Sequence, residues 1–526
     1  MGRHAAGESF LRGFVRYAKT DVFWAQVEKP EHAKAFALVV QAAGRPEPVR
    51  AVTKMSLAAL TQAGAVYYPG PGIGHYAWRR ALFGHEKWSL IGITHTTASA
   101  AAMDAIVELI TAPVQAWDAV ICTSRAVKDN VERVLQAQVD HLAQRLGVTR
   151  LVLPRMPVIP LGIHAEDFVF SDAQRSQARQ AIGAHEQTLV VLFIGRLSFH
   201  AKAHPLAMYQ ALELAAKGRK VVLVECGWYG NDSIRNAFTE AARSACPSVR
   251  VVTLDGRNAQ GRATAWASAD LFCSLSENIQ ETFGITPIEA MADGLPVVVS
   301  DWDGYKDTVR DGVDGFRIPT LMAPAGLGGD LAAAHALEAY TYDRYCGDSC
   351  TFSAVDVQAT AEAFGRLFAS PELRQQMGEE GRKRARAVYD WAVIIPKYEA
   401  LWAELAEIRQ QQAKKLPKLA HPWPARMDPF AAFSAYPTRT LTPKTILELA
   451  LPDAAEKLSL WRSLAMVDFA KRVLPAQEEC EAVLTTLASG PRPAGEVVQG
   501  LAPERQGFVF RSLAWMVKMG VLRVVA

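Results

Sequence analysis

Apolar residues in the middle of the chain follow two alternating patterns. Short apolar runs recur along the segment, and between them the apolar residues have helical spacing. Val297–Val299 is wholly apolar and β-branched, which is typical of a buried parallel strand, and Ile285–Asp293 before it has the pattern of a helix. Repeated strand–helix units with right-handed crossovers predict a parallel sheet with helices on its faces. The predicted strands are Leu189–Ile194, Lys220–Glu225, Val249–Leu254, Asp270–Cys273, Pro296–Ser300 and Phe316–Ile318.

The amino-terminal third predicts a second, less regular α/β region. Short α/β units are expected from Phe36 to Val66, with apolar runs at Ala37–Val40 and Val49–Val52. Strands are expected at Leu90–Thr94 and in the run that begins at Trp117, and a helix from Ala126 to Leu146. The loop of residues 69–74 is rich in Gly and Pro and is expected to form a turn. The Pro-rich stretch Leu151–Gly162 is expected to be extended and to end this region near Asp167.

The first helix, near Phe10–Ala18, has an apolar stripe and a basic face. The basic residues are Arg12, Arg16 and Lys19. That face is either a solvated surface or a patch that approaches an anionic membrane.

After residue 320 the patterns weaken and then return. Residues 323–353 are rich in Gly and Ala and are expected to be an irregular insertion near the ligand cleft. Helices are expected at 356–368, 371–389 and 391–405, and the Lys/Pro-rich stretch 410–437 is expected to be a linker. The last eighty residues read as helix–helix–helix–strand, which resembles a winged helix. The third helix carries only Arg511 and Lys518 as cations. So few positive charges favour a contact with another protein over binding to DNA.

Composition and charge narrow the class of protein. The 526 residues include 57 basic and 54 acidic side chains, a net charge of +3 that does not suggest a nucleic-acid binder. No apolar run approaches the roughly 20 residues that span a bilayer, and the start of the chain lacks the apolar core of a secretory signal. Cys122, Cys226 and Cys273 lie in or beside apolar strand runs and are expected to be core residues. Cys346 and Cys350 form the one close pair, and no His/Cys cluster accompanies it, so a reduced, cytosolic protein is expected.

Charged residues gather where the predicted strands end. Arg196 and Lys202 follow one strand, and Glu277 and Glu281 follow another. Ligands of open α/β sheets bind at the carboxyl ends of the strands, and Arg and Lys there can hold phosphate oxygens. Glu281 and Glu289 would lie about 12 Å apart if the step between them were wholly helical. That exceeds the roughly 5–9.5 Å of a glycosidase acid pair and disfavours hydrolysis.

The segment E-T-F-G-I-T-P-I-E-A-M-A-D-G-L-P from Glu281 closely resembles the donor-binding signature of family 4 of the retaining glycosyltransferases, with its Glu-x7-Glu spacing. The likeness extends over Leu189–Phe316 and includes Gly195-Arg196-Leu197 with Lys202. It implies an α/β protein of the GT-B fold, with two Rossmann-like domains facing a cleft and, in this chain, a small, mostly helical module at the carboxyl end. The expected parts are an acceptor domain (1–167), a nucleotide-sugar domain (168–388), a crossover helix (389–412), a linker (413–444) and the appendage (445–526).

The resemblance also implies roles for individual residues. Glu281 would hold the transferred sugar, and His95, at the end of a predicted strand, would face it across the cleft or be a structural residue. Glu289 would accept the ribose hydroxyls, although Thr286–Glu289 also fits a capping box at a helix start. The other donor-binding residues implied are Arg196, Lys202, Thr282, Phe283, Gly284 and Ile285.

Three features complete the comparison with the family. Its Gly-Gly-x-Pro-Glu is replaced by Asp303-Gly304-Tyr305-Lys306-Asp307, with Asp307 in the place of Glu. Asp301-Trp302-Asp303 has the Asp-x-Asp pattern of metal-dependent transferases, but it lies at a family loop and is not expected to hold a metal. Almost no strand residues precede Gly7, where the family has a first strand and a Gly-rich loop.

The function expected from the resemblance is transfer of a hexose from a nucleotide-diphosphate-sugar to a glycan or glycolipid, with retention and without a metal or other cofactor. Besides donor and acceptor, the expected partners are a membrane surface at the inner face and a protein at the carboxyl-terminal module, with no nucleic acid. The alternative is a non-catalytic scaffold that binds nucleotide-sugar and acts through that module.

Overall fold

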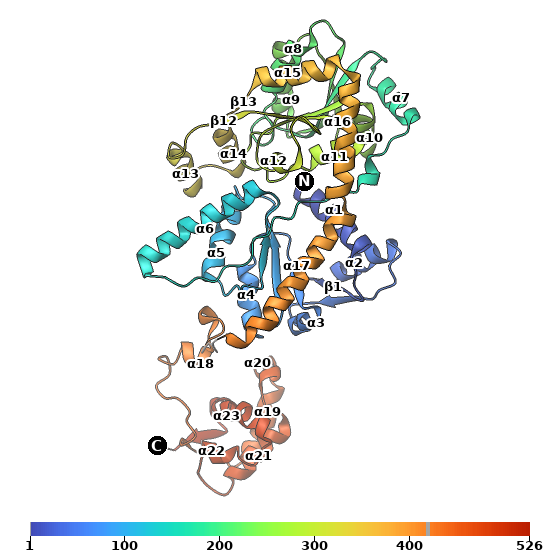
Figure 1. Ribbon diagram of the computed structural model, residues 1–526. Coiled ribbons are helices and arrows are strands. Elements are labelled where there is room, and N and C mark those ends of the chain that lie inside the picture. The colour runs from blue at the N-terminus through green and yellow to red at the C-terminus, as the bar shows by residue number, and fades with distance from the viewer. Residues whose placement is uncertain (1, 417–420, 526) are drawn as a thin grey trace. The chain divides into compact units, whose positions relative to one another are not determined.

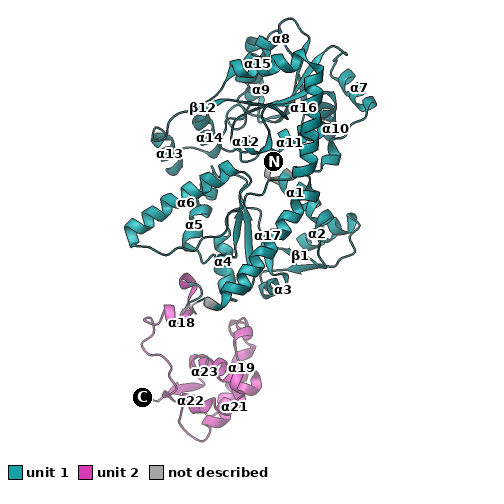
Figure 2. Ribbon diagram, viewed as in Figure 1, with its two compact units in different colours: residues 1–423 teal, residues 424–526 magenta. Residues whose placement is uncertain are grey.

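The computed structural model describes residues 2–416 and 421–525 and separates the chain into two compact units, residues 1–423 and 424–526 (Figure 2). The division lies inside the segment predicted as a linker, of which residues 417–420 fall outside the described residues. The first unit contains both α/β regions.

The larger α/β half of unit 1 is built on a six-stranded sheet in which every pair of neighbouring strands is parallel, in the order β11-β10-β9-β6-β7-β8. Each predicted strand is present, and most run one to four residues past the predicted end. The strands are β6 (Leu189–Leu197), β7 (Val221–Tyr229), β8 (Arg250–Asp255), β9 (Leu271–Ser274), β10 (Val297–Ser300) and β11 (Gly315–Ile318).

Alternate residues of these strands enter two separate cores. Val190, Leu192 and Ile194 pack in one core with α10 and α11, and Val191 and Phe193 pack in the other with α8, α9 and α15. A sheet buried on both faces explains why the strands are continuous apolar runs. The helices of this half are α7 (Asp172–Ala181), α8 (Leu206–Ala216), α9 (Asp232–Ala245), α10 (Ala259–Ser268), α11 (Ile285–Asp293), α12 (Tyr305–Thr308), α15 (Val357–Ala369) and α16 (Pro371–Arg384).

The amino-terminal half has two smaller parallel sheets. One pairs β1 (Phe23–Gln26) with β2 (Val49–Val52), and the other has the order β3-β4-β5, formed by Ala65–Tyr67, Ser89–Ile93 and Ala119–Ile121. The Pro-rich connector adds isolated bridges beside β5, at Arg155 and Val158. The helices are α1 (Gly2–Tyr17), α2 (Pro30–Ala42), α3 (Leu60–Ala63), α4 (Gly74–Ala81), α5 (Ala100–Thr111) and α6 (Arg125–Leu146).

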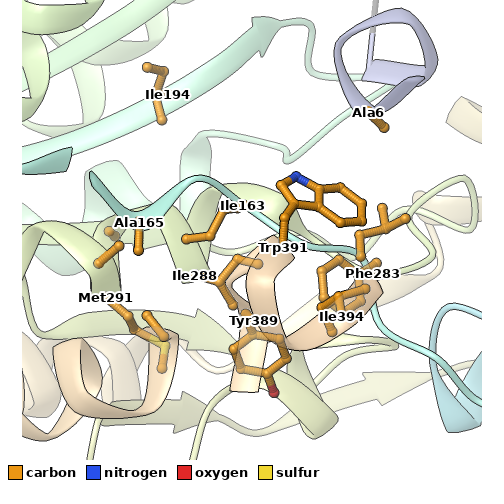
Figure 3. Packing of buried hydrophobic residues seen from close by; sticks show 14 of the residues in the cluster. Ala6, Ile163, Ala165, Ile194, Phe283, Ile288, Met291, Tyr389, Trp391 and Ile394 are labelled. Atoms are coloured by element: carbon orange, nitrogen blue, oxygen red, sulfur yellow. The ribbon is translucent and has the colours of Figure 1, made fainter. Parts of the chain in front are cut away.

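Helix α17 (Trp391–Gln412) ties the two halves together (Figure 1). At its start, Trp391 is 1% exposed and donates its indole N–H to Ser9 of α1 over 2.8 Å. A Cβ on Gly13 or Gly162 would lie 2.5 Å from the Trp391 ring, so both positions require glycine. Figure 3 shows this tryptophan beside Ile163, which directly follows the connector, and Phe283 of the segment before α11. Two Rossmann-like halves joined by a returning helix form the GT-B fold, as predicted.

Residues 323–353, predicted to be irregular, contain two helices, and two short strands lie at the borders of the segment. These are α13 (Gly329–Ala336), α14 (Tyr342–Cys350), β12 (Thr320–Met322) and β13 (Ser353–Val355), the strands pairing antiparallel. Thr341 caps α14 by accepting a hydrogen bond from the amide of Arg344. One face of α14 carries Tyr342, Cys346 and Cys350 at positions i, i+4 and i+8, which is a helical spacing. The helix was not predicted because the segment as a whole is rich in Gly and Ala.

The basic face of α1 is occupied by ion pairs. Arg12 contacts Asp167 over 2.6 Å, and Arg16 contacts Glu166. Two of the three predicted cations are therefore paired with acids of the same unit, and the third, Lys19, lies beyond the end of α1. This arrangement does not support the membrane-facing alternative for this face.

The second unit has its own core around Leu447, Val483, Val509 and Leu513. Its antiparallel sheet has the order β15-β14-β16, with β14 (Ile446–Leu449) in the centre, β15 (Arg492–Pro493) and β16 (Leu522–Val524). The helices are α18 (Pro429–Ala432), α19 (Ala454–Ser463), α20 (Ala465–Asp468), α21 (Gln477–Leu487), α22 (Ala494–Val497) and α23 (Pro503–Lys518).

All seven cysteines are buried and free, so the expectation that Cys122, Cys226 and Cys273 are core residues is confirmed. Of the helices in the described ranges, none has the length and apolarity that a membrane crossing requires.

Candidate active site

The two predicted phosphate-binding cations lie at the end of β6 (Arg196) and in the loop that follows it (Lys202). Arg196 donates to the backbone oxygen of Ala201 over 2.8 Å and lies 3.7 Å from the carboxylate of Asp343 in α14. Lys202 forms an ion pair with Glu281. Both side chains are about one-third exposed (34% and 29%), which leaves them accessible to a ligand.

Glu281 is held from several directions. Its side chain is 11% exposed, and burial alone would raise its pKa. The charge and hydrogen bond of Lys202, with hydrogen bonds from the amides of Thr282 and Phe283, outweigh burial and lower the pKa. The carboxylate therefore stays ionised and orients Lys202. The Phe283 amide, which the resemblance assigned to the donor, donates its hydrogen bond to Glu281 in this structure.

Helix α11 starts at the same corner. Its N-cap residue is Gly284, which has φ +82° and offers no side-chain cap to the first amides of the helix. A Cβ at this position would lie 1.9 Å from the Tyr305 ring, so both the backbone angle and the space require glycine. An uncapped helix start of this kind presents N–H groups and the positive end of the helix dipole.

This N-cap also decides between the alternatives for Glu289. Thr286 is the second residue of α11 and not its cap, so the capping-box interpretation of Thr286–Glu289 is wrong. Burial raises the pKa of Glu289 to about 7, although the charge of Arg262 acts in the opposite direction. Across the described residues, no hydrogen bond to the Glu289 carboxylate is found. A half-buried acid without such a partner can accept hydrogen bonds from hydroxyl groups of a ligand.

Direct hydrogen bonds connect the two halves beside Glu281. The Thr282 hydroxyl donates to the backbone oxygen of His95 over 3.3 Å. The Thr123 hydroxyl donates to the backbone oxygen of Thr282 over 3.2 Å. The backbone of His95 therefore meets Thr282, the residue after Glu281, and the role of the His95 side chain toward a sugar stays a prediction. The Thr282 side chain faces the other half of the unit.

Two further contacts across this seam were not predicted. Ser124 donates to Asp303 over 3.1 Å, and the guanidinium and amide of Arg125 donate to Asp307 over 2.7 Å. The hydroxyl residues at the end of β5 were visible in the sequence, but no periodicity indicates which acid they contact. Asp307, in the place of the family's Glu, is held by Arg125.

Asp303 occupies a backbone conformation that glycine adopts more easily, with φ +43°. Burial, and then the negative charge of Glu281, raise the pKa of its carboxyl to about 8. Asp301, two residues earlier, lies 3.5 Å from Arg317. The two acids of the Asp-x-Asp pattern thus have different partners. Within the described ranges, no three or more His, Cys, Asp or Glu side chains are grouped so that they could hold a metal ion.

Fold and site together define a class, the GT-B proteins, with a polar corner at the carboxyl ends of the strands of the second half. Within this chain, residues 174–325 match the family model described as "Glycosyl transferases group 1". The matched segment contains Arg196, Lys202, Glu281 and Glu289.

Curated relatives match over part of their length. The chain is 28% identical over 194 residues to the D-inositol 3-phosphate glycosyltransferase of Mycobacterium marinum, covering 36% of this chain and 40% of that protein. It is 30% identical over 161 residues to the phosphatidyl-myo-inositol mannosyltransferase of Mycobacterium tuberculosis strain H37Rv, covering 31% and 39%. The match thus spans about two fifths of each relative.

Among solved structures, the Anabaena protein HepE in complex with UDP and glucose is similar, with a TM-score of 0.47 and 16% identity. The similarity covers 73% of this chain and 99% of that one. The sucrose-phosphate synthase of Thermosynechococcus elongatus has a TM-score of 0.42 and 18% identity, with 72% and 78% covered.

Proposed function

We propose that the protein transfers a hexose from a nucleotide-diphosphate-sugar to a glycan or glycolipid acceptor, with retention and without a metal ion. The observation that carries the proposal is the corner formed by Arg196, Lys202 and the uncapped start of α11, with Glu281 paired to Lys202. The match of residues 174–325 to the glycosyltransferase model supports it.

In this proposal, the donor's pyrophosphate replaces part of the internal pairing of the two cations. Arg196 grips phosphate oxygens through its planar guanidinium, and Lys202 acts as a point charge between phosphate and Glu281. The amides of Gly284 and Ile285 face the same group, and Glu289 accepts the ribose hydroxyls. These groups stabilise the negative charge that develops on the diphosphate as it leaves.

The transfer breaks the bond between the anomeric carbon and the diphosphate oxygen and forms one to the acceptor oxygen on the same face. The acceptor's proton passes to an oxygen of the leaving diphosphate, so no separate base is required. Glu281 holds hydroxyls of the sugar and places negative charge near the anomeric carbon, where positive charge develops. His95 faces the sugar from the other half.

The acceptor and location follow from resemblance. The two curated relatives are named for inositol-containing acceptors, one of them a phospholipid. The lipid in the second name is compatible with a glycolipid acceptor for this chain. Use of that acceptor at the cytoplasmic face of a membrane, for a surface polysaccharide, rests on the family resemblance alone.

Melting curves of the full chain with UDP, GDP, ADP and their sugar conjugates test the proposal. A ligand that binds the native state raises the melting temperature, and at a hundred times Kd the stabilisation is about 2.7 kcal/mol. We expect one diphosphate to stabilise the chain. Glu289→Ala should weaken its binding about tenfold or more, because two hydrogen bonds to a charged group are lost.

Glu362→Ala, an exposed acid on α15, is the matched control and should respond as the unchanged chain does. The proposal fails if none of the three diphosphates stabilises the chain, or if Glu289→Ala responds as the control does. Binding of diphosphate without turnover of any sugar conjugate would favour the scaffold alternative.

A further inference from the structure

A cavity of about 830 Å³ lies on the larger half, outside the donor corner. Its walls are the loop between β6 and α8, helix α14 and strand β13, and Glu277 lines it from the loop after β9. Its volume is within the range of small-molecule sites, roughly 300–1,000 Å³. Helix α14 and strand β13 lie beyond residue 325, where the match to the glycosyltransferase model ends.

Glu277 is the buried acid of this cavity, with 4% of the residue exposed. Its carboxyl accepts from the backbone N–H of His204 over 3.1 and 3.4 Å, and burial raises its pKa to about 8. Near pH 7 the group therefore carries a proton for much of the time, and its O–H needs an acceptor. Within the described residues, no side chain supplies one. The buried hydroxyl oxygen of Ser353, which lines the cavity from β13, likewise has no hydrogen-bond partner among the described residues.

The charges on the walls largely cancel. Asp348 is paired with Arg344 over 2.6 Å, and Asp343 lies 3.7 Å from Arg196. Burial lowers the pKa of His204, so its ring is neutral near pH 7. Its Nδ1 accepts from the Leu206 amide over 3.4 Å, which leaves the Nε2–H as a donor for a ligand. A phosphate would need unpaired cations here and a cationic ligand unpaired acids. The cavity suits a neutral ligand with many hydroxyl groups.

Apolar wall residues complete the match to such a ligand. Phe199 and Leu206 lie on one wall, and Val355 lies on another. The C–H faces of a sugar ring pack against apolar and aromatic groups, while its hydroxyls take part in hydrogen bonds as donors and acceptors. The cavity thus has little net charge, hydrogen-bonding groups that a ligand can use, and an apolar wall. Carbohydrate-binding sites combine these three features.

We propose that this cavity is a second carbohydrate-binding site that takes a neutral sugar. Arg196 of the donor corner lies 3.7 Å from the carboxylate of Asp343 in α14. The hydroxyl of Tyr342, also in α14, lies 3.2 Å from the hydroxyl of Thr96, one residue after His95. Helix α14 thus contacts both sides of the seam where transfer is proposed. That the bound sugar belongs to the acceptor chain rests on the proposed function, whereas sugar binding itself does not.

Saturation-transfer NMR on the full chain tests the site. The probes are glucose, mannose, galactose and N-acetylglucosamine, each with the stabilising nucleoside diphosphate at saturation so that the donor corner is filled. We expect a signal from at least one sugar. Ala354→Trp, which places an indole in the cavity from an exposed position on β13, should weaken that sugar's binding at least tenfold. Glu277→Leu should weaken it several-fold, because the apolar side chain removes the O–H donor and the acceptor oxygens that the acid offers to the sugar.

Ala336→Trp is the matched control, since Ala336 is exposed on α13 and does not line the cavity. All three variants should keep the melting shift given by diphosphate. Absence of a signal from every sugar, or a signal unchanged in Ala354→Trp, overturns the proposal even if diphosphate still binds. Loss of diphosphate binding with intact sugar signals would instead contradict the proposed function and leave this site standing.

Discussion

At the scale of single residues, the Lys202–Glu281 pair is the most informative contact of the corner. The pair joins the loop after β6 to the loop after β9, and it keeps the Glu281 carboxylate ionised in a largely buried position. An acid in contact with a phosphate-binding lysine neutralises part of the charge that would attract phosphate. Its presence is therefore better explained by a role toward the sugar than by a role in diphosphate binding.

Glu281→Gln separates these two roles. Because the substitution removes a negative charge beside Lys202, diphosphate should bind as tightly as before or more tightly. Transfer of the sugar should fall about a hundredfold or more, since one positioned charge that acts in the transition state is worth about 3 kcal/mol. Calorimetric titration with diphosphate and a turnover assay with the sugar conjugate measure the two effects.

Glu240→Gln, an exposed acid on α9, should change neither quantity and serves as the control. If Glu281→Gln turned over at the normal rate, Glu281 would have no part in catalysis. If it lost diphosphate affinity instead, the carboxylate would be part of the diphosphate site.

At the scale of elements, the start of α11 depends on Gly284. Tyr305, which a side chain at 284 would strike, is itself fixed by a 2.9 Å hydrogen bond to Ser274. Movement of the Tyr305 ring would thus break a buried contact. The helix start can present its amides to a ligand only while this position lacks a Cβ.

Gly284→Ala should lower the melting temperature and abolish the shift given by diphosphate. Gly312→Ala is a matched control, because Gly312 has a similar positive φ of 71° but no atom within 4 Å of the added Cβ. Alanine at positive φ alone costs about 1 kcal/mol, so the control should melt slightly lower and still bind diphosphate. Equal melting and binding in the two variants would show that contact with Tyr305 is irrelevant.

How far the sequence predicts this fold varies with the element. The strands from β6 to β11 and helix α11 were predicted because burial on both faces makes apolar runs and 3.6-residue periods plain. Helix α14 was missed because Gly and Ala dominate its surroundings. Its role became visible only from contacts of Arg196 and Thr96 with residues more than a hundred positions away.

The site shows the same division. Arg196, Lys202, Glu281 and Glu289 were selected by spacing and resemblance, and the structure brings the first three together through the Arg196–Ala201 and Lys202–Glu281 contacts. The strained backbone of Asp303 and its bond to Ser124 were not predictable, because neither a φ angle nor a tertiary partner leaves a periodic signal. The alternative that made Thr286 the N-cap of α11 was wrong, because Thr286, Pro287 and Glu289 have the sequence pattern of a capping box although the helix begins earlier.

At the scale of the first unit, the corner is assembled by contacts that fix the two halves. Trp391 fills the space left by Gly13 and Gly162, and the seam contacts of Ser124 and Arg125 meet Asp303 and Asp307. The donor corner belongs wholly to the larger half, whereas His95 comes from the smaller one. In the proposed function the donor therefore binds to the larger half, and the smaller half contacts that half at Thr282, Asp303 and Asp307.

A crystal structure of the full chain with the nucleoside diphosphate that stabilises it tests the central claim most directly. The account predicts the pyrophosphate between Arg196, Lys202 and the amides of Gly284 and Ile285, with the ribose hydroxyls on Glu289. A nucleotide bound elsewhere, with that corner empty, would contradict the account.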